Sequence, residues 1–259
     1  MLLAAGRGVR MRPLTDTCPK PLLMVRGKPL MQWHLEALAH GGLGHVVVNT
    51  DWLGAQIADR FGSTFSLQPL SGKHEQLSIA EHLRISYSHE GNDFGHALET
   101  AGGIVRALPM LDEVFWVLAG DVFVPDFTFS QTMVDRFRAS GMLAHLWLVP
   151  NPEHHPQGDF GLEINLDTGN ALALNLPPQD PRPRYTYSTI GLYRQALFLP
   201  PWCPIPLGNP SGVIAALGPL LRSAMDQHRV SAQRFEGAWT DVGSPQRLAE
   251  LNLESGLPS

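Results

Sequence analysis

Cysteine is scarce in this sequence. Among 259 residues there are two, Cys18 and Cys203. Neither belongs to a CxxC pair or to a Cys/His pattern with the spacing of zinc ligands. We therefore expect no disulfide framework and no structural zinc site, and we predict two free thiols of the kind that persist in a reducing cytosol.

Long apolar runs and an excess of positive charge are also missing. No apolar stretch approaches the ~20 residues that span a bilayer, and no basic-then-apolar leader precedes the first expected strand. The formal net charge is −5, from 19 Lys and Arg against 24 Asp and Glu. We therefore expect a cytoplasmic protein that binds neither nucleic acid nor membranes.

Short apolar runs alternate with amphipathic ones along the first part of the chain. Strands are expected at 1–5, 45–49, 82–88, 114–121 and 142–149, and helices at 29–42, 51–62, the second half of 97–111 and about 130–140. This order is typical of an α/β fold with a Rossmann-like, mostly parallel sheet and helices on both faces. Ligands of such sheets bind at the carboxyl ends of the strands.

The later part of the chain is expected to be richer in strands. The pattern predicts a hairpin over 159–176 that turns at residues 167–170, a strand over 182–194, a helix over 213–228, a strand within 229–243 and a final helix over 244–256. Residues 68–80 and 199–212 are rich in Pro, Gly and polar residues, and we interpret them as loops or insertions.

The loop after the first strand has the composition of a phosphate cradle. Gly6 and Gly8 allow backbone N–H groups to approach phosphate oxygens in a tight turn. A dinucleotide motif would need a third glycine where Met11 stands, and a Walker motif is absent. Lys20 lies between two prolines, which fix φ on both sides and stiffen its presentation. A nucleoside triphosphate is the expected ligand, and a solvated glycine turn is the alternative.

The spacing within this loop resembles a known signature. The matching residues are Gly6-x-Gly8-x-Arg10-Met11-x-Pro13-Leu14-Thr15 and Pro19-Lys20-Pro21-Leu22. They closely resemble the signature of sugar-phosphate nucleotidyltransferases, α/β enzymes that join a sugar 1-phosphate to a nucleoside triphosphate and release pyrophosphate. Relatives usually carry several residues before this motif, so the first strand is either short here or begins upstream of Met1.

This resemblance implies roles for the residues of the loop. The nucleotide would be held by Ala5, Gly6, Arg7, Gly8 and Val9. Arg10 would neutralise the β- and γ-phosphates, and Lys20 would contact the α-phosphate that is attacked. Phosphoryl transfer depends on positioning and charge neutralisation, which suits these residue types.

Two aspartates match the family in order and context. Asp121 follows the apolar run 114–120, and Asp241 lies in the turn Trp239-Thr240-Asp241-Val242-Gly243. Each alone could be a helix cap or a turn former. The resemblance implies that they hold Mg²⁺, which would template an in-line displacement. Arg10, Lys20, Asp121 and Asp241 would then form the catalytic set.

The stretch 88–104 is similar to the base-reading part of the family. Glu90 could accept a hydrogen bond from uracil, thymine or guanine, so it does not decide the base, and an exposed loop glutamate is the alternative. The resemblance implies that Glu90, Thr100 and Gly102 contact the nucleotide and that Glu99 contacts the sugar.

The stretch 149–162 is the most informative about the sugar. It resembles the Asn-Pro-x-His-His-x-x-Gly-Asp-Phe run of the N-acetylmuramate α-1-phosphate uridylyltransferase branch, which serves peptidoglycan recycling. The resemblance implies that Asn151 and Asp159 reach the sugar, with Thr189 as a further candidate. The adjacent histidines are not expected to bind a metal, because neighbouring side chains point apart.

The resemblance also implies an architecture and partners. We expect a GT-A-like nucleotidyltransferase fold with one domain over 1–259, in which 1–150 form the nucleotide-binding half and 151–259 form a sugar-binding half with a β-rich subregion and the second metal ligand. Its partners would be UTP, a sugar 1-phosphate and Mg²⁺. Mannose 1-phosphate guanylyltransferase, glucose 1-phosphate thymidylyl- or uridylyltransferase activity and a catalytically silent sugar-nucleotide sensor stay open as alternatives.

Overall fold

The structure is a computed structural model that describes residues 1–67, 82–164 and 171–253. The contacts between residues divide the chain into two compact units. Unit 1 contains Met1, Leu98–Leu118 and Val134–Gly237, and unit 2 contains Leu2–Ala97, Ala119–Met133 and Ala238–Ser259. Each unit is therefore assembled from segments that are far apart in the sequence.

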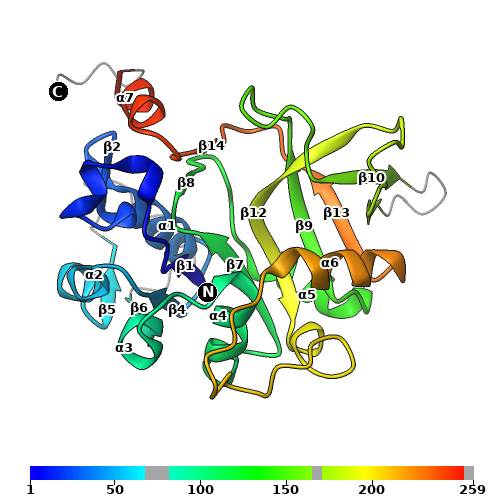
Figure 1. Ribbon diagram of the computed structural model, residues 1–259, viewed down its shortest axis with the longest axis horizontal. Helices are drawn as coiled ribbons and strands as arrows, with labels where there is room; N and C mark the ends of the chain where they lie inside the picture. Colours follow the sequence, from blue (N-terminus) through cyan, green and yellow to red (C-terminus); the bar gives the residue numbers. More distant parts are fainter. Residues whose placement is uncertain (68–81, 165–170, 254–259) are drawn as a thin grey trace. The chain divides into compact units, whose positions relative to one another are not determined.

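Unit 2 contains a largely parallel sheet, labelled in Figure 1. Its strands are β1 (Leu2–Ala4), β4 (His45–Thr50), β6 (His82–His89) and β5 (Thr64–Ser66), in this spatial order. β1, β4 and β6 run parallel, and β5 pairs antiparallel with β6. The helices of this unit include α1 (Leu30–His40), α2 (Gly54–Phe61) and the short α3 (Glu90–Phe94). The sequence predicted the longer of these elements, but not β5 or α3.

Shorter elements of unit 2 surround one apolar cluster. They are the hairpin of β2 (Met24–Val25) and β3 (Lys28–Pro29), the ladder of β8 (Val122–Phe123) with β14 (Thr240–Asp241), and α7 (Pro245–Leu253). The buried members of the cluster are Met11, Leu23, Val25, Leu30, Phe123, Val242, Leu248 and Leu251. Met11 has no exposed surface. The residue that breaks the three-glycine dinucleotide pattern is thus a core residue that anchors the opening loop.

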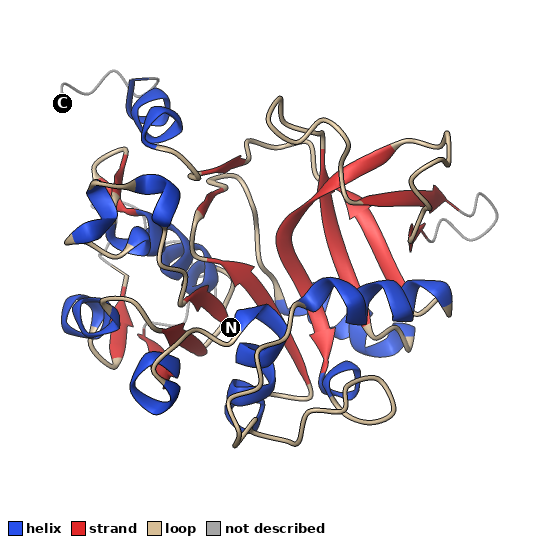
Figure 2. Ribbon diagram, in the orientation of Figure 1, coloured by secondary structure: helices blue, strands red, loops and turns tan. Residues whose placement is uncertain are grey.

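Unit 1 is dominated by antiparallel pairing, and Figure 2 shows its long strands in red. The strands are β10 (Phe160–Ile164), β11 (Ala171–Leu174), β13 (Val230–Arg234), β9 (Ala144–Val149), β12 (Arg184–Arg194) and β7 (Val114–Ala119), in this spatial order. β13 and β9 are parallel, and the other described pairs are antiparallel. The predicted hairpin is confirmed by β10 and β11. Its turn at 167–170 and the whole of the predicted loop 68–80 lie outside the described residues.

The helices of unit 1 include α4 (Glu99–Ala107) and α6 (Leu217–Asp226), and α5 (Gln131–Ser140) begins in the last residues of unit 2. The prediction that only the second half of 97–111 is helical was wrong, because α4 begins at Glu99. The prediction that Gly102 contacts the nucleotide did not include a packing role, and a Cβ there would lie 2.5 Å from the carbonyl oxygen of Val213. The glycine is retained inside the helix because another segment of backbone crosses it.

The α/β fold class predicted from the sequence is confirmed. Both cysteines are free. Within the described ranges, no helix combines the length and the apolar character that crossing a bilayer would require.

Candidate active site

The opening loop of unit 2 begins where β1 ends, at the carboxyl edge of the parallel strands. Gly8 has a left-handed conformation with φ of +64°, and its carbonyl accepts hydrogen bonds from Met11 N at 2.8 Å and from Thr15 Oγ1 at 2.7 Å. These bonds close the turn on itself. Gly6, Arg7, Val9 and Arg10 are exposed. Arg10 forms no ion pair with any residue that the structure describes, so its charge is available to a ligand.

Trp52 attaches this loop to the start of α2. Its indole Nε1 donates to the carbonyl of Thr15 at 2.8 Å, and the guanidinium of Arg7 lies 4.4 Å from the centre of its ring. Gln56 Nε2 donates to the carbonyl of Thr17 at 3.1 Å. A hydrogen bond and a cation–π contact from one side chain therefore restrain both arms of the loop.

Lys20 is buried and faces Asp121. Its side chain is 9% exposed, and Nζ lies 2.6 Å from Asp121 Oδ2. The nearby His34 adds no positive charge at neutral pH, because burial lowers its pKa to about 4 against the opposing effects of the Val122 backbone and the Asp121 carboxylate. Lys20 is therefore the cation that balances Asp121. The side chain predicted to contact a phosphate is held inside the site and is not a solvated surface lysine.

A short ladder brings Asp241 next to Asp121, although about 120 positions separate them along the chain. Asp241 pairs with Val122, and Val242 N donates to the carbonyl of Asp121 at 2.8 Å. Gly120 positions the first carboxylate, because its N–H donates to Leu3 O at 2.7 Å and a Cβ there would meet β1 at 2.9 Å. The close approach of β1 thus explains the glycine that precedes Asp121.

Asp241 also has a basic partner, which the sequence interpretation did not include. Arg247, in the first turn of α7, forms an ion pair with Asp241 through Nη1 and Oδ1. The two side chains are 19% and 22% exposed, respectively. A basic residue in a terminal helix has the pattern of a solvated face, so nothing in the sequence distinguished Arg247.

The carboxylates of Asp121 and Asp241 suit Mg²⁺. They are hard oxygen ligands, and Mg²⁺ is typically held by one or two carboxylates together with water and substrate phosphates. Within residues 1–67, 82–164 and 171–253, His, Cys, Asp and Glu form no group of three that could enclose a metal. Asp121 and Asp241 therefore fit a cation that brings most of its own coordination shell.

Glu90, predicted to read the base, is fully buried at the start of α3. Its Oε1 accepts a hydrogen bond from Asn49 Nδ2 at 2.7 Å, and Asn49 Oδ1 accepts one from Ala4 N at 2.8 Å. The alternative of an exposed loop glutamate was wrong. The buried pair supports the end of β1, and direct contact with a base would require Glu90 to become accessible first. The sequence interpretation also missed Asn49, because an asparagine ending an apolar strand looks like a turn former.

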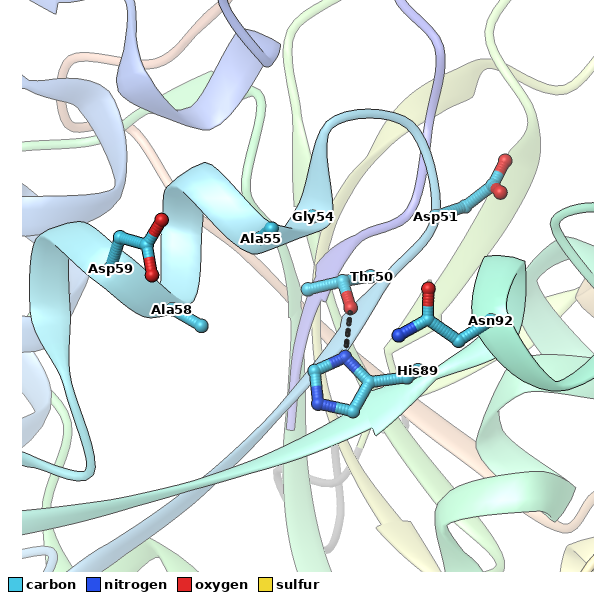
Figure 3. Close-up of a pocket in the computed structure, with 8 residues that line it drawn as sticks. All are labelled: Thr50, Asp51, Gly54, Ala55, Ala58, Asp59, His89 and Asn92. Carbon is cyan, nitrogen blue, oxygen red and sulfur yellow. Dashed lines mark hydrogen bonds between the residues drawn. The ribbon is translucent and has the colours of Figure 1, made fainter.

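A cavity of about 210 Å³ lies beside this pair, at the carboxyl ends of β4 and β6. Figure 3 shows His89 and Asn92 facing it, with α2 on the other side. Thr50 Oγ1 and His89 Nδ1 are 3.1 Å apart. The cavity is also lined by the carboxylates of Asp51 and Asp59, whereas Thr50 is itself buried.

Glu99, Thr100 and Gly102 lie in the first turn of α4, in unit 1. Ala101 N and Gly102 N both donate to the carbonyl of Ala215, at 2.8 and 3.0 Å. Asn209, which is fully buried, donates through Nδ2 to the carbonyl of Gly102 at 3.1 Å. The segment 209–215 thus supplies hydrogen-bond partners to the first turn of α4, and the backbone N–H groups of Ala101 and Gly102 are already paired within the protein.

Asn151 and Asp159 brace the loop before β10. Asn151 donates through Nδ2 to the carbonyls of Pro156 and Arg184, and its Oδ1 accepts a hydrogen bond from Thr186. Asp159 Oδ2 accepts a 2.8 Å hydrogen bond from Tyr187 N, and Oδ1 lies 3.2 Å from His155 Nε2. Both side chains therefore shape the 151–159 loop, and their polar atoms are already engaged with the protein.

Two of the predicted sugar-binding residues have a left-handed backbone. Glu99 has φ of +62° and Thr189 has φ of +66°. A β-branched residue such as Thr is a clear outlier in this region. Thr189 lies within β12, where the register to β9 shifts between Tyr187 and Gly191. Strain of this kind is concentrated at ligand sites and turns, which keeps both residues as candidates.

The fold and these groups define a class of protein. Proteins bind phosphate groups with the features found here, which are a Gly-rich loop at a strand end, a buried lysine and two neighbouring carboxylates. The sequence model of the family "Nucleotidyl transferase" matches residues 1–256. The chain belongs to this family, and it is a nucleotidyltransferase.

Three individual proteins show how similar this chain is to members of known activity or structure. The N-acetylmuramate alpha-1-phosphate uridylyltransferase of Neisseria meningitidis is 41% identical over 269 aligned positions, covering 99% of this chain and 97% of that protein. The UTP–glucose-1-phosphate uridylyltransferase of Synechocystis is 31% identical, covering 94% of this chain and 59% of that protein. A UTP-bound UGPase from Acinetobacter baumannii has the same fold, with a TM-score of 0.71, 17% identity, and coverage of 99% of this chain and 92% of that one.

Proposed function

We propose that this protein transfers the uridylyl group of UTP to N-acetylmuramic acid α-1-phosphate, forming UDP-N-acetylmuramic acid and pyrophosphate. The observation that carries the proposal is the 41% identity to the N-acetylmuramate alpha-1-phosphate uridylyltransferase over nearly the whole of both chains. The reaction belongs to peptidoglycan recycling, and we place it in the cytoplasm.

The proposed reaction needs no nucleophile from the protein. A phosphate oxygen of the sugar 1-phosphate attacks the α-phosphorus of UTP, a new P–O bond forms, and the bond between the α-phosphorus and the bridging oxygen breaks as pyrophosphate leaves. Because both reactants are anions, the task of the protein is to hold them together and balance their charge. The exposed Arg10 and the buried Lys20 supply positive charge from one loop.

We assign nucleotide contacts to Ala5, Gly6, Arg7, Gly8 and Val9 and charge neutralisation of the β- and γ-phosphates to Arg10. Lys20 is assigned to the α-phosphate, which requires it to exchange Asp121 for that group. Glu90, Thr100 and Gly102 are assigned to the nucleotide side, and Glu99, Asn151, Asp159 and Thr189 to the sugar side. The strained backbone of Glu99 and Thr189 supports the latter assignment. The halves 1–150 and 151–259 would carry nucleotide and sugar recognition, respectively.

We further propose that Asp121 and Asp241 hold Mg²⁺. When bound, Mg²⁺ would offset phosphate charge and template an in-line displacement. The support is the pairing of Asp241 with Val122, the residue after Asp121, which brings the two aspartates close together in the fold.

A substrate panel tests the proposal. Pyrophosphate release is measured with UTP, dTTP and GTP, each combined with the 1-phosphates of N-acetylmuramic acid, glucose, N-acetylglucosamine and mannose. We expect the highest kcat/KM for UTP with the muramic acid substrate. Preference for glucose 1-phosphate or for GTP with mannose 1-phosphate would instead establish one of the alternative transferases. Nucleotide binding without pyrophosphate release from any pair would establish a sensor.

A further inference from the structure

The ion pair between Arg247 and Asp241 occupies a closely packed position in unit 2. A Cβ on Gly243 would lie 2.5 Å from Arg247 Nη2 and 2.8 Å from Asp241 Oδ2. No side chain would fit at residue 243 without displacing the pair. The Asp241 carboxylate and the Arg247 guanidinium therefore both lie against the backbone of Gly243.

Arg247 is itself held by Ser244 and by the packing of α7. Its backbone N and its Nε lie 3.3 and 3.4 Å from Ser244 Oγ, which begins the turn into α7. The same helix packs Leu248 and Leu251 into the apolar cluster that contains Val242, the neighbour of Asp241. The guanidinium thus approaches Asp241 from a helix that is anchored to the same core as the β14 strand.

Each of the two aspartates of the site has a basic partner. Asp121 is balanced by Lys20, and Asp241 is balanced by Arg247. Lys20 leaves its carboxylate if it moves to a phosphate, as the proposed function requires. Arg247 belongs to a packed helix turn and is not assigned to a phosphate. Its pairing with Asp241 is therefore compatible with a cation on the same carboxylate. Groups that hydrogen-bond to metal-binding carboxylates orient them and typically change metal affinity by 10- to 100-fold when removed.

We propose that Arg247 is a positioning residue that orients Asp241 for a divalent cation and thereby sets the metal affinity of the site. The inference rests on the proposed function, since it requires Asp241 to be a metal ligand. Arg247 contacts neither substrate nor metal in this scheme. It acts on the metal through Asp241, so its removal lowers turnover where the metal is not saturating.

The test measures Mn²⁺ binding to the full-length protein by electron paramagnetic resonance, without nucleotide. Arg247→Met keeps much of the side-chain length and removes the charge and the donors. We expect its Mn²⁺ affinity to fall at least ~10-fold. Arg247→Lys keeps the charge but loses the planar fork, and we expect an intermediate affinity. At saturating Mg²⁺, kcat of Arg247→Lys should return to within a few-fold of wild type.

A merely structural role for Arg247 would be to hold α7 in place, and a matched variant separates the two roles. Asn252, at the other end of α7, accepts a hydrogen bond from Arg26 N at 2.7 Å and donates to the carbonyl of Met24 at 3.1 Å. Asn252→Ala loosens the same helix without touching Asp241. We expect it to lower thermal stability and leave Mn²⁺ affinity unchanged. Equal losses of affinity in Asn252→Ala and Arg247→Met would overturn the positioning role.

Asp241→Asn distinguishes failure of this inference from failure of the proposed metal site. If Asp241→Asn binds Mn²⁺ as tightly as wild type, Asp241 is not a ligand, and both the metal assignment and the inference are wrong. If Asp241→Asn loses affinity while Arg247→Met does not, only the inference is wrong. Circular dichroism and thermal melting of each variant establish that the affinities come from folded protein.

Discussion

Substituting Gly243 by alanine perturbs the candidate site without altering any charged group. No positive φ applies to Gly243, so alanine can adopt the backbone conformation. The new methyl group would instead collide with the Arg247–Asp241 pair, at 2.5 Å from Nη2 and 2.8 Å from Oδ2. The perturbation is therefore a displacement of one carboxylate and its partner.

The size of the displacement follows from these distances. Ordinary contact between carbon and its neighbours begins at about 3.5 Å, so the guanidinium must move by about 1 Å and the carboxylate by about 0.7 Å. Misplacing a reacting or binding group by ~1 Å can cost ~100-fold in rate. We expect kcat/KM to fall by ~10- to 100-fold. The free energy of unfolding should change little, because the displaced atoms are the ends of flexible side chains.

The assay is pyrophosphate release across a titration of Mg²⁺, with Mn²⁺ binding as an independent readout. Gly44→Ala is the control, because nothing lies within 4 Å of a Cβ at that position and its φ is not positive. In an Arg247→Met background the same Gly243→Ala change should cost less, since the two residues share one contact. Wild-type turnover and Mn²⁺ affinity in Gly243→Ala would refute the idea that the position of Asp241 matters.

Three further predictions concern other parts of the molecule. Trp52→Phe removes the 2.8 Å hydrogen bond to Thr15 O but keeps an aromatic ring beside Arg7. UTP affinity, measured by calorimetry, should therefore fall about 5-fold, the equivalent of ~1 kcal/mol. Unchanged affinity would show that UTP binding does not depend on this hydrogen bond. Lys20→Met should lower kcat at least ~100-fold in single-turnover assays and change the nucleotide Kd less, and an effect on KM alone would contradict its role at the α-phosphate. Burial lowers the pKa of His145 from 6.5 to about 4. Between these pH values the unfolded chain binds a proton at His145 that the folded chain does not bind. The free energy of unfolding therefore falls by up to ~1.4 kcal/mol per pH unit as the pH decreases. His145→Phe should reduce this loss in urea denaturation at pH 7.5 and 5, and equal losses in both proteins would disprove it.

Secondary structure could be predicted best where a local residue pattern is compatible with only one kind of element. The run of valines in β4 and the amphipathic stripe of α1 could each be placed within a few residues. The glycine turn before Met11 and the carboxylate after β7 were located by the rule that ligands bind at strand ends. The ladder that brings Asp241 to Asp121 could be expected only from the family resemblance, because pairing between two-residue strands has no periodic signal.

What the sequence could not give are interactions that depend on tertiary packing. The sequence interpretation assigned Gly102 to a ligand contact, but the backbone of Val213 lies where a side chain at this position would be. Glu90 reads as a loop residue, yet Asn49 holds it in a fully buried position. In each case the residue that makes the contact is distant in sequence, so the local composition and spacing do not predict the contact.

The charge pairing suggests how one site could accept a metal and a polyanion together. Removing Lys20 from Asp121 would leave a carboxylate that is 44% exposed and a buried ammonium group, each without its partner. Both costs are relieved if a cation meets Asp121 while a phosphate meets Lys20, so each ligand favours the binding of the other under the proposed mechanism. Reciprocity then requires that UTP raise Mn²⁺ affinity by the same factor by which Mn²⁺ raises UTP affinity. Lys20→Met should weaken that coupling, because the exchange of partners is its physical basis.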